Sequence, residues 1–402
     1  MTNAATTSTP ETGMSGSMTA LFALAGGVVV GNLYWAQPLL DTIGESLRVA
    51  PGRTGLIITM AQVGYALGVF FIVPLGDALQ RRRLIPAVMA VSMLGLIATA
   101  FAPSYGLLIA AILIVGLSSV TGQLLTPLAG DLAGPEHRGR TIAIVASGVM
   151  FGVLVSRSIG GFIADLGGWR SVFVLAAALN LVMALVLARA IPLLTTRAHV
   201  GYGALLRSVL AEVRGSARLR IFMILGACTM AVFTTFWTGL TFLLSAPPYG
   251  FSVSSIGLVS LVGVFGALAA QYVGRLYDRG WAVATIGAGL AVTFGAMVCT
   301  AFSGGSLVMV LVTVAVSSVG IQAVFVLVQT SVMAINPEAR SRLNTAIIVG
   351  NFIGGAIGST LAALVWDTGG WPLLAGTAAA LSLLGLIVWA VQRRRTLSGT
   401  PA

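Results

Sequence analysis

An arginine stands inside one of the most apolar stretches of the chain. Arg157 is the only charged residue between positions 141 and 164. A guanidinium at membrane depth is costly, so we expect it to face protein or an aqueous cavity and to have a partner. Two interpretations are open. The side chain donates to backbone carbonyls between packed helices, or its forked donors bind the anionic part of a substrate.

Polar side chains recur at helical spacing in four other apolar stretches. In the first, Tyr34, Gln37 and Asp41 stand at i, i+3 and i+7, on a face that a lipid-facing helix would avoid, with Asn32 and Trp35 well away from it. The other sets are Ser119, Gln123 and Thr126; Thr234, Thr238 and Thr241; and Ser318, Gln322, Phe325 and Gln329. Each residue alone could make an interhelical hydrogen bond. Together they predict a mostly apolar wall with aromatic and amide groups, suited to a small amphipathic organic molecule.

Residues for enzymatic or metal chemistry are missing from the pattern. No stretch resembles a metal cluster, a nucleotide-binding glycine loop or a nucleophile elbow, and neither His137 nor His199 has a partner at ligand spacing. Cys228 and Cys299 lie in apolar stretches and are interpreted as small buried hydrophobes. The sequence therefore predicts a protein that is no enzyme and needs no metal or cofactor.

The composition places these residues in membrane-spanning helices. Hydrophobic residues make up 57% of the 402 residues and charged ones 8%, against about 25% charged in soluble domains. A span needs about 20 apolar residues. The apolar stretches are 12–40, 54–76, 84–130, 141–164, 171–188, 221–274, 280–337, 343–366 and 368–392, of which 84–130, 221–274 and 280–337 each hold two spans. The prediction is an all-α integral membrane protein with twelve helices.

The positive charges predict the orientation. Every basic residue is arginine, and with a cytoplasmic N-terminus only Arg48, Arg53 and Arg170 would lie in loops on the far side. Positive loops mark the cytoplasmic side, so both termini are expected there. The net charge of +11 is then a topological signal rather than a nucleic-acid footprint.

The chain repeats itself half a length later. Asp165-Leu166-Gly167-Gly168-Trp169 returns as Asp367-Thr368-Gly369-Gly370-Trp371, and Gly148 and Gly152 return at the same offset as Gly350 and Gly354. Such a repeat predicts two six-helix halves with a substrate path between them. The predicted segments are a polar tail 1–17, a half 18–190, a cytoplasmic amphipathic linker 191–220, a half 221–392 and a basic tail 393–402.

Two short turns carry a recognisable pattern. Val73-Pro74-Leu75-Gly76-Asp77-Ala78-Leu79-Gln80-Arg81-Arg82-Arg83 and Gly274-Arg275-Leu276-Tyr277-Asp278-Arg279-Gly280 resemble the loop signature of the major facilitator superfamily. The resemblance implies that each aspartate caps the next helix and pairs with arginines, as a cytoplasmic gate. The gate residues would be Asp77, Arg81, Arg82, Asp278 and Arg279, with Asp131 completing the set. The first copy departs from the signature at Val73, Ala78 and Gln80, so its lock is expected to be weaker or to depend more on Arg81 and Arg82. A cluster of arginines with only a topological role is the alternative.

The stretch from Gly148 to Gly161 resembles the antiporter motif of the same family, with Arg157 where the motif has proline. Small residues at this spacing let helices approach closely. Membership would imply that the four polar stripes line a central cavity. The predicted substrate contacts are Tyr34, Gln37, Ser119, Gln123, Thr126, Arg157, Thr234, Thr238, Gln322, Phe325 and Gln329. Asp165 and Asp367 are expected to cap the turns that the Gly-Gly-Trp segments close.

The resemblance implies a transporter that works by alternating access in a bacterial inner membrane. It is expected to act as a monomer, to carry a small molecule and to bind no nucleic acid. The string Gly31–Leu40 resembles one found in bacterial efflux-type members of the family, which favours the efflux direction. The resemblance to the antiporter branch implies proton-coupled efflux of a drug-like compound or metabolite, although all acids lie at helix ends, loops or tails. Asp41 and Asp131 are the candidate proton carriers. The first alternative is a carrier for an anionic metabolite bound by Arg157, without proton coupling. The second is a non-transporting receptor or sensor.

Overall fold

The described part of the computed structural model comprises residues 14–134, 136–193, 201–302 and 306–397, and every regular element in it is helical. The helices of the first part of the chain are α1 (Gly16–Gly31), η1 (Gln37–Leu39), α2 (Leu40–Leu47), α3 (Pro51–Phe71), α4 (Leu75–Ala78), α5 (Arg81–Ala100), α6 (Tyr105–Ser118), α7 (Thr121–Leu132), α8 (Arg138–Gly167) and α9 (Trp169–Ala190). They are followed by α10 (Tyr202–Gly215), α11 (Ala217–Ser245), α12 (Val253–Val259), η2 (Ser260–Gly263), α13 (Val264–Asp278), α14 (Ala282–Ala301), α15 (Leu307–Met333), η3 (Pro337–Ala339), α16 (Arg340–Gln392) and η4 (Arg393–Leu397).

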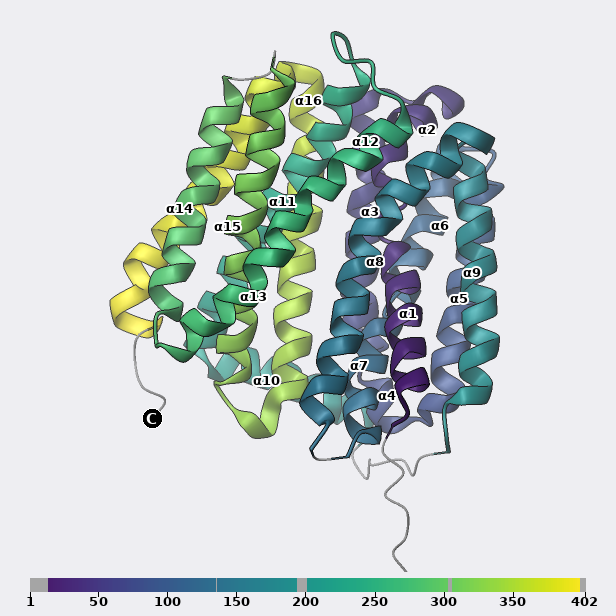
Figure 1. Ribbon diagram of the computed structural model, residues 1–402, viewed down its shortest axis with the longest axis vertical. Coiled ribbons are helices and arrows are strands. Elements are labelled where there is room, and N and C mark those ends of the chain that lie inside the picture. Colours follow the sequence, from purple (N-terminus) through teal and green to yellow (C-terminus); the bar gives the residue numbers. More distant parts are fainter. Residues whose placement is uncertain (1–13, 135, 194–200, 303–305, 398–402) are drawn as a thin grey trace, which may run out of the picture.

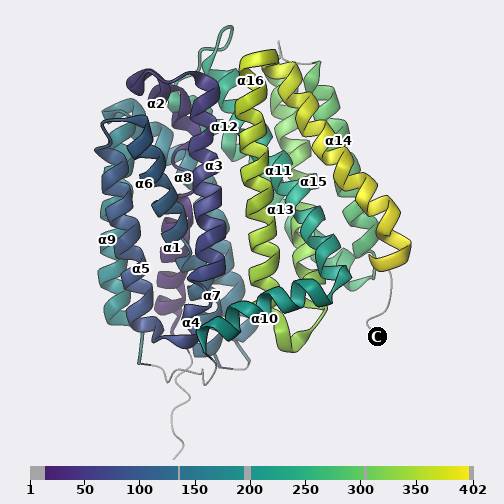
Figure 2. The ribbon, with the colours of Figure 1, turned by 180° about the vertical axis from the view of Figure 1, so that it is seen from behind.

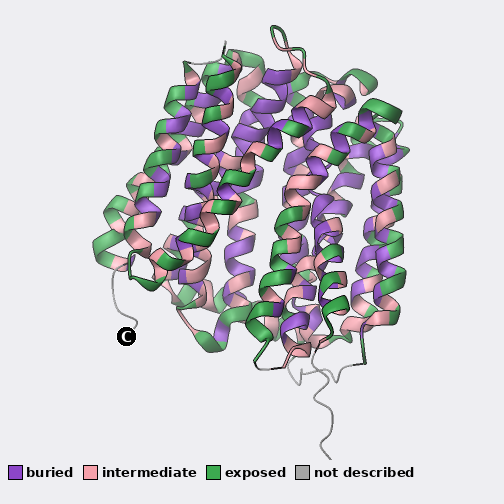
Figure 3. Cartoon of the chain, viewed as in Figure 1, coloured by how far each residue is buried: buried purple, intermediate pink, exposed green. Residues whose placement is uncertain are grey.

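When directly consecutive helices are counted as one, ten helical segments of the described residues are long and apolar enough to cross a membrane. The last, Pro337–Leu397, bends at Gly370, whose φ of 55° is open to glycine, and α1 is a shorter apolar helix. The chain is a multi-pass membrane protein, while the count of twelve spans stays a prediction. Large apolar side chains such as Phe101 and Phe151 are exposed, as lipid contact allows. Exposed residues recur along the outer helices of the bundle (Figure 3).

Two groups of helices lie side by side, α1–α9 in one and α11–α16 in the other (Figures 1 and 2). Helix α10 lies across one end of both groups, next to α4 (Figure 2). We call this the basic end, because Arg81–Arg83 lie here, and the opposite one the α2 end. Helix α10 lies within the predicted linker 191–220, with Val209 buried and Leu205 half-buried on one face.

Glycines bring helices together within each group. A Cβ on Gly148 would lie 2.5 Å from the carbonyl oxygen of Ala23, and one on Gly152 would overlap Gly27, so α8 packs directly on α1. In the second group a Cβ on Gly354 would overlap the backbone of Ala227 in α11. The close helix approach predicted from these glycines is confirmed.

The two groups also contact each other toward the α2 end, through α3 with α16 and α8 with α12. A Cβ on Gly55 would lie 2.9 Å from that of Ala363, and one on Gly257 would lie 2.6 Å from the carbonyl oxygen of Arg157. Close backbone contact at two helix pairs therefore closes the α2 end.

One cysteine expectation is wrong. Cys228 is buried in α11, as predicted, but Cys299 is exposed on α14. Hydropathy alone does not tell a lipid-facing from a core-facing position on an apolar helix.

Candidate substrate site

The first helix is interrupted where it carries its polar residues. Helix α1 ends at Gly31 and is followed by turns. The 3₁₀ segment η1 then begins at Gln37 and contains Pro38, which has no N–H for a helical hydrogen bond. The single helical face predicted for Tyr34, Gln37 and Asp41 does not exist, because Asp41 lies on the separate helix α2. The break nevertheless directs the first two side chains toward Arg157.

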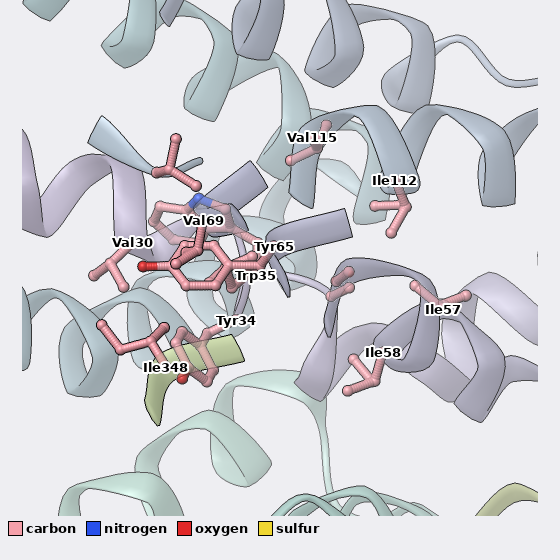
Figure 4. Close-up of a cluster of buried hydrophobic side chains, with 14 of the residues drawn as sticks. Val30, Tyr34, Trp35, Ile57, Ile58, Tyr65, Val69, Ile112, Val115 and Ile348 are labelled. Carbon is pink, nitrogen blue, oxygen red and sulfur yellow. The ribbon is translucent and has the colours of Figure 1, made fainter. Parts of the chain in front are cut away.

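The interrupted segment is anchored on its other side. The Asn32 amide donates to Ser92 Oγ at 3.1 Å and Asn180 Oδ1 at 3.3 Å, and Trp35 Nε1 donates to Asn32 Oδ1 at 3.3 Å. Trp35 and Tyr34 lie among buried side chains, with Tyr65 and Ile348 nearby (Figure 4). The buried amide network thus fixes the backbone that presents Tyr34 and Gln37.

Arg157 is 3% exposed and forms the centre of a mixed aromatic and polar cluster. Its Nε donates to Gln37 Oε1 at 2.5 Å. The guanidinium carbon lies 4.7 Å from the ring centres of Tyr34 and Trp237 and 5.5 Å from that of Phe233. Rings stabilise a buried cation, but within the described residues neither a carboxylate nor a backbone carbonyl pairs with this side chain.

Two buried donors of this cluster have no hydrogen-bond partner among the described residues: Arg157 Nη2 and Gln37 Nε2. Thr238 Oγ1, on α11 one residue beyond Trp237, is also unpartnered. A small cavity adjoins Arg157, lined by Gln37, Pro38, Arg157, Trp237, Leu240, Thr241, Ile256 and Gly257. Its volume of about 10 Å³ is enough for about one water molecule. A larger molecule can enter only if the two groups of helices separate.

A second polar cluster joins the groups between Arg157 and the basic end. Gln123 Nε2 donates to the Tyr65 hydroxyl at 3.1 Å, and Gln329 Nε2 donates to Asn344 Oδ1 at 2.6 Å. The bond that crosses between the groups runs from Asn344 Nδ2 to Gln123 Oε1, at 3.4 Å. The ring centre of Tyr65 lies 4.2 Å from that of Phe352 on α16.

The other predicted contacts lie in different surroundings. Ser119 and Thr126 donate to carbonyls one turn earlier in the chain, of Val115 at 2.6 Å and Gly122 at 2.9 Å. Thr234 donates to the Gly355 carbonyl at 2.8 Å and so joins α11 to α16. Gln322 and Phe325 are half-buried on α15.

Trp237, Phe233 and Asn344, which contact Arg157 or Gln123, are absent from the residues predicted from the sequence. The internal repeat points to Asn344, because the equivalent residue in the first half is the apolar Ile142 and the two copies therefore differ here.

Of the two predicted sets of gate residues, only the first forms ion pairs within the described residues. Arg81 donates to Asp131 Oδ2 at 2.9 Å and Asp77 Oδ1 at 3.1 Å, whereas Arg82 Nε donates to the Ala188 carbonyl at 3.3 Å. In the second copy Asp278 and Arg279 are exposed, and no ion pair joins them within the described residues.

The helix caps implied by the resemblance are not formed. Gln80 and Trp281 occupy the cap positions of α5 and α14 without side-chain hydrogen bonds.

The candidate proton carriers differ in their surroundings. Asp131 is held by Arg81, with Arg138 at 4.0 Å. Asp41 lies on α2, outside the spanning helices, where burial, and then Glu45, raises the pKa of its carboxyl. Neither carboxylate hydrogen-bonds to Arg157 in the described structure.

Comparison with known proteins gives consistent matches. The family model described as Major Facilitator Superfamily matches residues 21–334. The transporter YgaY of Escherichia coli O157:H7 is 38% identical over 380 residues, covering 94% of this chain and 96% of that protein. A relative with a named substrate, the niacin transporter NiaP of Acinetobacter baylyi, is 31% identical over 141 residues, 34% of this chain and 31% of that protein. A solved bacterial homologue of the human lysosomal transporter Spinster, inward-facing and unoccupied, superposes with a TM-score of 0.75 at 17% identity, covering 96% of this chain and 98% of that one.

Proposed function

Since the chain belongs to the Major Facilitator Superfamily and is a membrane transporter of that kind, we propose that it carries a small organic anion across the bacterial inner membrane. The two groups of helices would act as the rocking halves of an alternating-access carrier, with Arg157 binding the anion between them.

The unsatisfied donors around Arg157 carry this proposal. Leaving a buried charge and a buried amide without acceptors is costly. Arg157 Nη2 and Gln37 Nε2 both need an acceptor, and the hydrogen bond from Arg157 Nε to Gln37 Oε1 holds the two side chains together. A carboxylate offers two acceptor oxygens that a guanidinium and an amide could share.

The surrounding side chains favour an organic anion over an inorganic one. Trp237, Leu240, Ile256 and Pro38 line the cavity next to the donors. Apolar walls with a few placed polar groups are typical of sites for small organic ligands. A carboxylate with a compact apolar body fits this combination, and the name of NiaP indicates that a relative carries such a molecule.

Proton-coupled efflux of a drug-like compound, the first prediction from the sequence, has less support. A cationic compound would be repelled by Arg157, and the described carboxylates lie near helix ends or between helices rather than beside that site. The efflux direction rests only on the resemblance of Gly31–Leu40. The receptor alternative has no support from relatives, which are transporters.

The arginines support an orientation with the basic end in the cytoplasm. Arg81–Arg83 and the exposed arginines of α10 gather at this end, and positive loops are retained on the cytoplasmic side. The closed α2 end would then face the periplasm. A substrate bound at Arg157 would leave toward the cytoplasm by opening the Gln123–Asn344 contact.

Binding of paired probes tests the proposal. Purified protein is titrated with benzoate and nicotinate, and with benzamide and nicotinamide, which keep the ring but lack the charge. A ligand that binds only the folded protein raises its stability by about 2.7 kcal/mol at 100 times Kd. We expect the carboxylates to raise the thermal midpoint and the amides to leave it unchanged. Equal stabilisation by both members of a pair would reject an anion site.

A further inference from the structure

Two aspartates at the α2 end accept hydrogen bonds across the interface between the halves. Asp165 Oδ2, at the end of α8, accepts from the Ser254 backbone N–H at 3.1 Å. Asp367 Oδ1, on α16 just before its bend, accepts from the Gly52 backbone N–H at 3.1 Å. The sequence pattern predicts that each aspartate caps its own Gly-Gly-Trp turn. The structure shows that each instead caps a helix of the opposite half.

The two contacts are related by the internal repeat. Asp367 is the equivalent of Asp165, and Ser254 is the equivalent of Gly52, at the same offset in the chain. Each donor lies in the first turn of a helix, α3 in one case and the helical run Val253–Asp278 in the other. First-turn N–H groups have no partner within their helix, and the positive end of the helix dipole favours a carboxylate.

Both caps require the halves to be in contact. A Cβ on Gly161 would lie 2.5 Å from the Val253 carbonyl oxygen, and one on Gly52 would overlap the Asp367 carboxylate. The helix starts can reach the aspartates because glycine permits this approach. Separation of the halves at the α2 end breaks both hydrogen bonds together.

We infer that Asp165 and Asp367 form a paired latch that stabilises the conformation closed at the α2 end. The latch sets which side of the membrane the Arg157 site opens to, and the two aspartates are positioning residues in transport. A contact made in only one of two conformations shifts the equilibrium toward that conformation. This inference rests on the alternating access of the proposed function, and it stands whichever substrate is carried.

Cysteine accessibility in purified protein tests the latch. Cys228 and Cys299 are replaced by alanine, and one reporter is introduced: Thr241→Cys in the cavity, or Thr345→Cys, which lines a small cavity at the basic end. Labelling with a charged maleimide is followed at concentrations where labelling is slow relative to opening. A helix cap contributes roughly 1 kcal/mol, so Asp165→Ala or Asp367→Ala should speed Thr241→Cys labelling about fivefold. The double variant should speed it about 25-fold if the caps act independently.

The controls separate a latch from general loosening. Asp165→Asn and Asp367→Asn keep a good capping acceptor and should stay within about twofold of the parent. Glu45→Gln removes an exposed acid at the same end, without a cap, and should change neither reporter. A latch predicts that labelling of Thr345→Cys does not rise. Unchanged Thr241→Cys labelling in both alanine variants, or an equal rise of both reporters, would overturn the inference.

Discussion

Replacement of Arg157 by glutamine should remove most of the affinity for an organic anion. Hydrogen bonds to charged groups contribute about 1.5–3 kcal/mol each, and the guanidinium offers Nη2 as a free donor beside Gln37 Nε2. Loss of the charge and one such bond should weaken binding by about 3 kcal/mol, or somewhat over a hundredfold in Kd. Lysine keeps the charge but lacks the planar fork, so Arg157→Lys should fall between, about tenfold weaker than wild type.

The same substitution should change the stability of the unliganded protein little. Glutamine removes a buried cation that has no carboxylate partner in the described structure, which relieves a penalty of several kcal/mol. It also loses ring contacts with Tyr34, Trp237 and Phe233, each contributing roughly 0.5–2 kcal/mol. These terms are opposite in sign and similar in size. A substrate role therefore predicts lost affinity with a preserved thermal midpoint.

Isothermal titration with benzoate, combined with thermal denaturation of each variant, measures both quantities. Gln37→Leu is a companion variant that removes the second donor and should weaken binding at least about tenfold, because one hydrogen bond to the charged carboxylate is lost. The reasoning is refuted if Arg157→Gln folds and binds benzoate within threefold of wild type. A large fall of its thermal midpoint without ligand would instead identify Arg157 as a structural residue.

Three further predictions concern packing, the basic end and pH. Gly354→Ala should destabilise the protein by about 2 kcal/mol, because its methyl group would overlap Ala227. The control variant Gly295→Ala, whose methyl group would enter open space, should be neutral or stabilising. Equal thermal midpoints of the two variants would show that α11 and α16 do not pack closely. A double-mutant cycle of Gln123→Ala and Asn344→Ala should give a coupling of about 0.5–1 kcal/mol in unfolding free energy, and strictly additive effects would mean that their hydrogen bond is not formed. Burial raises the pKa of Asp41, so the native protein binds this proton more tightly than the unfolded chain and loses that stability as pH rises through the native pKa. The thermal midpoint of Asp41→Asn relative to that of wild type should therefore increase from acidic to neutral pH. A difference between the two midpoints that decreases over this range would contradict the prediction.

Residue type and the internal repeat made part of the site predictable. A lone arginine in an apolar stretch has few roles, and the structure places Tyr34, Gln37 and Arg157 in one cluster. Paired glycines predicted close helices because their effect is local and needs only one neighbour. The helical fold follows from hydropathy.

The parts that escaped prediction depend on contacts between distant segments. Trp237 and Phe233 have no special spacing in an apolar helix, so their approach to Arg157 emerges only when the halves meet. The break after Gly31 was hidden because the polar spacing beyond it imitates a helix. The partners of Asp165 and Asp367 lie in the opposite half, and a local capping rule could not identify them.

Flux in proteoliposomes tests the central claim most directly. Purified wild type and Arg157→Gln are reconstituted, and labelled benzoate and benzamide are followed while internal pH is recorded under an imposed pH gradient. An anion site at Arg157 predicts saturable benzoate flux that Arg157→Gln abolishes, with protein-dependent benzamide flux absent. Protein-dependent flux of a cationic compound against protons, retained in Arg157→Gln while benzoate is not carried, would contradict it.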